Sequence, residues 1–267
     1  MRYPKSSIQL NEARDLPLLR QILHSEFAAH SQLLEFMRLE HYEQNRNSFN
    51  WRLRRLANSR LVVRHAPSAD GGEVVYSLAS IGVEFLQGRG ENCLFARDRS
   101  GGRHAERSVL HALELNEIHL SALRAGVLVR WTAAPEIRSQ NELTEFGFAK
   151  DYDAIVTVQT DASEYRFALE CERSPKTIDR YRAIAAALSI EKRVSQVLYL
   201  VARDDLLKYV SGQLGKAKCR VYFGLARDWH AQLLDMPVTS SLSIRPLRLR
   251  DALQGASTRP NPPGVAL

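Results

Sequence analysis

The sequence predicts an α+β or α/β protein in which a small helical domain with a β-hairpin precedes a larger domain built on a mixed sheet. Three amphipathic helical segments between residues 11 and 59 are followed by two β-rich runs, at 61–63 and 74–76. Between 105 and 225, apolar strand-like runs alternate with helical segments, an order typical of a mixed sheet covered by helices. The 267 residues, 45% of them hydrophobic, suffice for two domains that each bury a core.

Shifts in composition predict the domain boundaries. The segment 88–104 is polar, basic and glycine-rich, which is typical of an interdomain linker, and it separates a domain at 8–87 from a second at 105–235. Residues 236–267 form a C-terminal extension whose last part, from Gln254, is rich in proline, glycine and small residues. Such a segment buries too little apolar surface to stay ordered by itself, so we expect a flexible tail.

The sequence of the first domain predicts three helices and a hairpin. A stripe of four apolar residues after Asn11 predicts the first helix, Ser31 is a candidate N-cap for the second, and the third runs from about 45 to 59. The two β-rich runs flank the turn Asp70-Gly71-Gly72, and a closing helix follows at 80–86. This order predicts a winged helix-turn-helix.

The second domain opens with a helix from Glu106 that ends at Gly126, a residue suited to the C′ position. Further strands and helices are then expected in alternation. The strands are expected at 127–131, near Glu136 or Phe146, and at 154–159, 165–172, 196–202 and 220–225, and the helices at 174–188 and 204–214.

The third helix has the residues that a DNA-recognition helix needs. Phe49, Leu53 and Leu56 share one face and are expected in the core. Arginine can bind guanine edges or phosphates, and asparagine can bind adenine with two hydrogen bonds. The face opposite the core carries Asn47, Ser48, Trp51, Arg54, Arg55 and Asn58.

The hairpin adds Arg64 and His65 just before its tip, where a wing would meet phosphates. We therefore expect binding to double-stranded DNA, by a homodimer as in many winged helices. The alternative is a solvated charged helix beside an ordinary hairpin. Trp51 in particular could contact DNA, lie beneath the wing or lie at a dimer contact.

Charge and cysteine content limit the partners and the cellular compartment that we expect for the protein. Lys and Arg outnumber Asp and Glu by 37 to 30, which gives a net charge of +7 and is compatible with a polyanionic partner. The three cysteines form neither a disulfide framework nor a metal pair, so a reducing cytoplasm is expected. No apolar run is long enough to cross a bilayer, and no membrane partner is expected.

Carboxylates gather in the second domain. Glu170 and Glu172 alternate along one strand and share a face, while Asp153 begins the preceding strand, so the hairpin can bring the three together. Glu117 on the opening helix is a further candidate. Clustered carboxylates attract Mg²⁺ or Mn²⁺, which could activate water against a phosphodiester, with Asp153 and Glu170 as metal ligands. The alternative is a set of ordinary solvated acids.

These motifs carry two resemblances. An Asp at one strand start and Glu-x-Glu after the next hairpin resemble the PD-(D/E)xK restriction-endonuclease-like fold, in the order αβββαβ. The chain from about 10 to 230 also resembles the replication-relaxation family of plasmid and mobile-element proteins. The matching pieces are LRRLANSRLVVR with Tyr76-Ser77-Leu78, His111 with Asn116, Trp131 with Glu136, Tyr152-Asp153-Ala154, and Phe167–Arg173 leading to Tyr181.

The resemblance implies a role in plasmid replication, mobilisation or transcription control and a location at the bacterial nucleoid or plasmid. Two departures count against catalysis: Glu172 stands where the nuclease pattern has its lysine, and Tyr152 stands where it has proline. Lys150, Lys176 or Arg180 could reach the acids and substitute for that lysine.

The leading hypothesis is therefore a sequence-specific DNA-binding protein with an inactive nuclease-like domain that needs no cofactor to bind DNA. The first alternative is a Mg²⁺-dependent endonuclease using Asp153 and Glu170, and it depends on whether a lysine reaches these acids. The second is an interaction module of a mobilisation or replication complex, for which the salt dependence of DNA affinity would be shallow.

Overall fold

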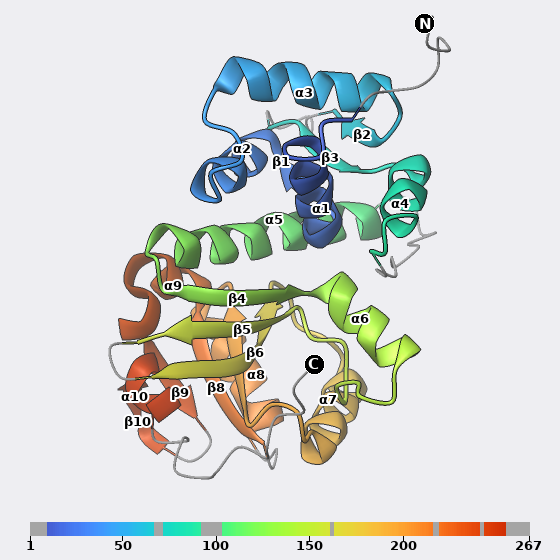
Figure 1. Cartoon of the computed structure of the whole chain (residues 1–267). Coiled ribbons are helices and arrows are strands. Elements are labelled where there is room, and N and C mark those ends of the chain that lie inside the picture. The colour runs from blue at the N-terminus through green and yellow to red at the C-terminus, as the bar shows by residue number, and fades with distance from the viewer. Residues whose placement is uncertain are drawn as a thin grey trace, which may run out of the picture. The chain divides into compact units, whose positions relative to one another are not determined.

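A computed structural model describes residues 10–66, 72–91, 103–160, 163–215, 219–240 and 243–254 of the chain, without the side chains of 103–105 and 243–245. By its internal contacts the chain divides into two compact units, Met1–Leu120 and Ser121–Leu267, each described here by itself (Figure 1). No helix among the residues described has the length and apolar character required to span a membrane.

The first unit combines helices with a three-stranded antiparallel sheet. The sheet has the order β1-β3-β2, and β2 pairs with β3 from Val62↔Leu78 to His65↔Val75. The elements are α1 (Asp15–Ser25), β1 (Ala28–Ala29), α2 (His30–Leu39), α3 (Arg46–Asn58), β2 (Val62–His65), β3 (Val75–Leu78), α4 (Ser80–Gln87) and most of α5 (Arg103–Arg124). The expected helices and hairpin are confirmed, whereas the two-residue strand β1 was not foreseen. Residues 70–71 of the expected turn lie outside the described residues.

Local sequence explains where these helices begin. The side chain of Asn45 caps α3 by accepting hydrogen bonds from the backbone N–H groups of Asn47 (2.8 Å) and Ser48 (3.1 Å). The expectation that Ser31 caps the second helix is wrong: the N-cap is Ala29, two residues earlier, and its N–H donates to Gln32 Oε1 (3.2 Å).

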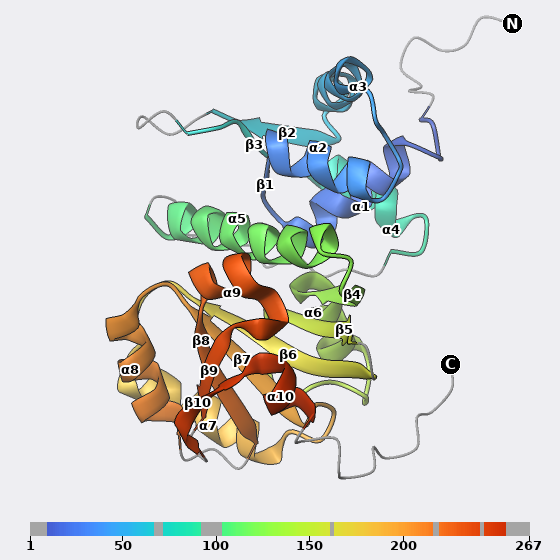
Figure 2. The same cartoon turned by 90° about the vertical axis from the view of Figure 1, so that its left-hand side faces the viewer.

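The second unit is built on a seven-stranded mixed sheet of order β10-β9-β8-β7-β6-β5-β4. β6, β7 and β8 run parallel, and the other neighbours pair antiparallel (Figure 2). Its elements after the end of α5 are β4 (Leu128–Ala133), α6 (Ala134–Leu143), β5 (Ala154–Gln159), β6 (Glu164–Glu172), α7 (Ile178–Ile190), β7 (Gln196–Val201), α8 (Asp204–Leu214), β8 (Arg220–Leu225), α9 (Ala226–Gln232), η1 (Leu233–Asp235), β9 (Pro237–Ser240), β10 (Ser243–Arg248) and α10 (Leu249–Gln254). The expected mixed sheet is confirmed.

Two parts of the second unit differ from the sequence prediction. The expected strand near Glu136 or Phe146 is wrong: Glu136 lies in the first turn of α6, where its carboxylate accepts the N–H of Ala133 (2.8 Å), and Phe146 lies in a turn. Residues 236–254, expected as an extension outside the domain, form β9, β10 and α10 and continue the sheet, because Val238 and Leu253 are buried. The expected flexible tail falls on 255–267, outside the described residues.

The expected linker also differs from the observed division. Most of 88–104, namely 92–102, lies outside the described residues, and the contacts divide the chain at 120 within α5. The reason is that α5 packs into the first unit: Asn116 Nδ2 donates to Phe27 O (2.8 Å), and Gln32 Nε2 donates to Leu113 O (2.9 Å).

One face of the large sheet positions the acidic residues. Ile155, Ala168 and Tyr199 belong to the core that this face forms with α7 and α8. Because side chains alternate along strands, Glu170 lies on the same face as Ala168, two residues away, and its register partner on β7 is Tyr199.

Candidate functional site

The outward face of α3 is accessible to a partner. Trp51 is 59% exposed, so the alternative that it lies beneath the hairpin is wrong. The exposed polar residues of this surface are Asn47, Arg54 and Asn58 on α3 and Arg64 on β2. Phe49, Leu53 and Leu56 are buried on the opposite side, as the helical periodicity predicts.

Three residues expected on the DNA-facing surface are instead engaged with the protein. Ser48 Oγ donates to Glu43 (2.7 Å), and His65 Nε2 hydrogen bonds with Ser77 Oγ (2.8 Å). Burial lowers the pKa of His65 and favours its neutral form. Arg55 forms an ion pair with the fully buried Asp15, and its guanidinium lies 5.0 Å from the Trp51 ring centroid. Arg54, like Arg46 at the start of the helix, is an exposed arginine of α3.

A buried ionic network beneath α3 was missed by sequence reasoning. Asp15 is fully buried and accepts hydrogen bonds from Arg52 Nη1 (2.7 Å), Arg55 and the N–H of Asn11 (2.6 Å). Arg52 Nη2 also contacts Glu43 (3.5 Å). The available signal was Arg52 itself, a charged residue on the core side of the helical pattern. The network fixes α3 to the start of α1 and to the loop that precedes α3.

The network also controls the ionisation of its acids. Burial alone would raise the pKa of Asp15, but the hydrogen bonds from Arg52, Arg55 and Asn11 outweigh it, and the pKa is lowered. Asp15 is thus held as a carboxylate at neutral pH, which keeps the arginine pairs intact.

In the second unit the hairpin brings the predicted acids to neighbouring positions. Glu170 and Glu172 are 6% and 5% exposed, and Asp153 is half-buried and accepts the N–H of Cys171 (2.7 Å). Lysines reach two of them: Lys150 forms an ion pair with Glu170, and Lys176 forms one with Glu172.

Arg180, the third cation considered from the sequence, is exposed on α7. Glu117 belongs to the first unit, where it accepts a hydrogen bond from Gln32 Nε2 (2.8 Å). Across the part of the chain that the structure describes, no three or more His, Cys, Asp or Glu side chains are arranged to hold a metal ion. Metal binding by Asp153 and Glu170 stays a prediction.

Burial and charge act differently on the members of this cluster. Burial raises the pKa of Glu170, and the charge of Asp153 adds to the rise, although Lys150 opposes it. The pKa of Lys176 is also raised: burial would lower it, but the hydrogen bond to Glu172 and the surrounding carboxylates outweigh burial. Lys176 is consequently a stable ammonium ion, whereas burial keeps the pKa of Glu170 raised despite its contact with Lys150.

Tyr199 on β7 joins this cluster and was missed from the sequence. Its side chain is fully buried, and its hydroxyl has no hydrogen-bond partner among the described residues. Burial and then the charges of Glu170, Asp153 and Glu172 raise its pKa well above the usual value, so the phenol is neutral. The available signal was a hydroxyl-bearing residue in the middle of the apolar run VLYLV of this strand.

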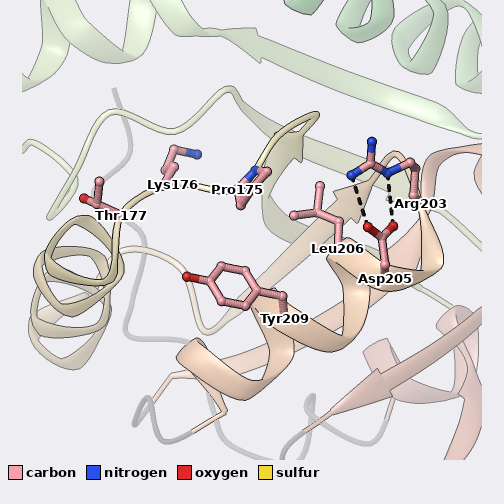
Figure 3. Close-up of a pocket in the computed structure, with 7 residues that line it drawn as sticks. All are labelled: Pro175, Lys176, Thr177, Arg203, Asp205, Leu206 and Tyr209. Carbon is pink, nitrogen blue, oxygen red and sulfur yellow. Dashed lines mark hydrogen bonds and ion pairs between the residues drawn. The ribbon is translucent and has the colours of Figure 1, made fainter.

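An open pocket of about 410 Å³ lies at the carboxyl ends of β6 and β7 (Figure 3). Its lining residues are Pro175, Lys176, Thr177, Arg203, Asp205, Leu206 and Tyr209. Arg203 and Asp205 form a two-bond ion pair at one side of it, at 3.0 and 3.1 Å. Lys176 belongs both to this pocket and to the acid cluster.

The amino-acid sequence matches the profile of a known protein family. The sequence profile described as replication-relaxation matches residues 19–195, which include α3, the acids and Lys176. The chain belongs to the replication-relaxation family. No curated protein sequence is significantly similar to this replication-relaxation protein.

Among solved structures, a restriction endonuclease FokI structure bound to DNA matches at 7% identity and a TM-score of 0.26, covering 94% of this chain and 49% of that one. A second FokI structure matches at 7% identity and a TM-score of 0.24, covering 84% of this chain and 44% of that one. The replication-relaxation protein thus spans about half the length of the FokI chains.

Proposed function

We propose that this replication-relaxation protein binds double-stranded DNA through a winged helix in its first unit, with α3 as the recognition helix. The observation that carries the proposal is the exposed polar face of α3, with Arg54 at its centre and its opposite face buried. The element order supports it, because α1, α2 and α3 precede a β2–β3 hairpin whose sheet also includes β1.

Different residues of the proposed surface would contact bases and phosphates. Arg54, Asn47 and Asn58 are free to approach base edges, and Arg64 on β2 is exposed for phosphate. The buried Asp15 and Arg52 hold α3 in place, which lowers the conformational cost of binding. As a homodimer, the protein would bind two half-sites about 34 Å apart, in plasmid or mobile-element DNA at the nucleoid.

The test is a titration of Arg54→Ala with plasmid DNA fragments at physiological salt. We expect affinity to fall at least about tenfold, because one good arginine contact contributes roughly 1–3 kcal/mol. Arg182→Ala is the control, since it removes the same charge from an exposed position on α7. Equal affinities of the two variants would show that α3 does not contact DNA.

Salt dependence separates this function from that of a protein-interaction module. If phosphate contacts dominate, the logarithm of affinity should fall steeply and linearly with the logarithm of salt concentration. A flat response would favour an interaction module of a mobilisation or replication complex.

A second candidate function is metal-dependent cleavage of DNA, and one observation favours it: Lys150 and Lys176 both reach the acid cluster. The carboxylate oxygens of Asp153 and Glu170 are ligands that suit Mg²⁺ or Mn²⁺. The Tyr199 hydroxyl, which has no hydrogen-bond partner among the described residues, could bind another polar group. A bound Mg²⁺ would lower the pKa of its water and stabilise charge on a phosphodiester. The charged Lys176 would stabilise negative charge on the same phosphate.

Plasmid nicking with Mn²⁺ tests this second candidate. Nicking by the wild type that is lost in Asp153→Asn would establish it. We retain DNA binding without cleavage as the principal proposal, because Glu172 occupies the position of the nuclease lysine and already binds Lys176.

A further inference from the structure

The hydroxyl of Tyr199 is the least satisfied polar group of the acid cluster. The side chain is fully buried, and the hydroxyl has no hydrogen-bond partner among the described residues. Buried hydroxyl groups almost always have a partner, since removing one from water without a replacement hydrogen bond costs free energy. A phenylalanine would fill nearly the same volume without that cost. The hydroxyl therefore indicates a missing ligand or water.

The surroundings indicate what that ligand is. Tyr199 is the register partner of Glu170 on the neighbouring parallel strand, and the charges of Glu170, Asp153 and Glu172 all act on its hydroxyl. Three carboxylates gather at this place, and Lys150 and Lys176 contact Glu170 and Glu172. A group that fits here is positively charged and also offers a hydrogen-bonding partner to a neutral phenol.

A hydrated divalent cation has both properties. Mg²⁺ and Mn²⁺ prefer carboxylate oxygens, and Mg²⁺ bound through one or two carboxylates keeps several water molecules. Those waters need partners of their own, and partners around a metal site affect its affinity. A neutral hydroxyl provides a partner without adding a charge.

We propose that the Tyr199 hydroxyl binds a water of hydration of a divalent cation held by Asp153 and Glu170, and so positions the cation between β5, β6 and β7. The proposal rests on the metal site of the second candidate function, to which it adds a positioning residue. It does not depend on whether DNA is cleaved.

The experiment measures Mn²⁺ binding to the full chain by electron paramagnetic resonance, together with the Tm in metal-free buffer. Tyr199→Phe is the variant. Tyr222→Phe is the matched control, because Tyr222 is buried in the same sheet and its hydroxyl already donates to Ala252 O (2.9 Å). Asp153→Asn assigns the bound ion to this site.

We expect Tyr199→Phe to weaken Mn²⁺ binding about two- to tenfold, because this is the usual contribution of one hydrogen bond. Tyr222→Phe should leave Mn²⁺ binding unchanged. Without metal, Tyr199→Phe should melt at or above the wild-type temperature, because an unsatisfied hydroxyl has been removed. Tyr222→Phe should melt below it.

Each other outcome overturns a specific statement. If the wild type binds no Mn²⁺, or if Asp153→Asn binds Mn²⁺ as well as the wild type does, the metal-dependent function fails and this proposal fails with it. If the wild type binds Mn²⁺ there and Tyr199→Phe binds it equally well, only the role of Tyr199 fails. If metal-free Tyr199→Phe melts as low as Tyr222→Phe, the hydroxyl has a protein partner and the proposal is wrong.

Discussion

Among the described residues, a buried ionic cluster in the first unit and another in the second are built differently. Beneath α3, the planar guanidinium of Arg52 contacts both Asp15 and Glu43, and the pKa of each acid is lowered. In the second unit, lysines contact Glu170 and Glu172 one at a time, and the pKa of Glu170 is raised. Arginine can serve two carboxylates at once, whereas a lysine ammonium acts as a point charge.

This difference gives the acids of the two clusters opposite effects on the stability of the fold as pH changes. Asp15 stabilises the fold above its unfolded pKa of 3.8, and that contribution is lost as pH falls through its lower folded pKa. Glu170 does the reverse: its raised folded pKa favours the fold at low pH, and that contribution is lost as pH rises above 4.5 through the folded pKa. A cluster that loses stability when its acid ionises is suited to binding a cation.

The largest expected effect comes from removing the shared arginine of the first cluster. Arg52→Met keeps much of the side-chain volume but leaves two buried carboxylates without their common partner. We expect a loss of roughly 3–5 kcal/mol in the free energy of unfolding, measured with denaturant. Arg54→Met on the exposed side is the control and should change stability by less than about 0.5 kcal/mol. Similar values for both variants would mean that the network does not hold α3.

A smaller effect is expected from the corresponding change in the second cluster. Lys150→Met removes the partner of Glu170, whose pKa is already raised, so this acid can take up a proton instead of remaining charged. We expect a loss of about 1–3 kcal/mol at neutral pH. The loss should shrink as pH is lowered toward 4.5, because folded Glu170 then takes up a proton and no longer needs a cationic partner. A loss independent of pH would show that Lys150 acts through packing alone.

A gain in stability is expected from Asp153→Asn in metal-free buffer. The amide oxygen can still accept the N–H of Cys171, while the charge that repels Glu170 is removed. We expect up to about 1 kcal/mol of stabilisation, against the usual trend for mutations, increasing with pH as Glu170 ionises. Mn²⁺ should raise the Tm of the wild type more than that of the variant. Destabilisation with no response to metal would show that the acids are ordinary structural groups.

The smallest effect is expected at a solvent-exposed pair. Arg182 and Asp179 contact each other at 3.0 Å, with side chains 76% and 88% exposed. Asp179→Asn should leave the Tm within experimental error, because water screens such pairs. A shift as large as that of Lys150→Met would imply that exposure does not explain the contrast between the clusters.

Local patterns were predictable from the sequence. Apolar β-rich runs located β5 and β6, and a period of 3.6 residues located α3 and its buried face. Contacts distant in sequence were not predictable: Asp15 and Arg52 are 37 residues apart, and no local pattern joins them. For the same reason Arg55 was assigned to the DNA-facing surface and Tyr199 was overlooked. β10 was missed because its pairing with β9 is interrupted by a register shift.

The exposed indole of Trp51 gives the protein an optical probe of its own. The chain has three tryptophans; Trp229 is 1% exposed, and Trp131 is half-buried. Trp51 should therefore dominate the red edge of the emission spectrum and the collisional quenching by acrylamide. A duplex lying along α3 would shield that ring, so its arrival can be timed by stopped-flow fluorescence on unlabelled protein.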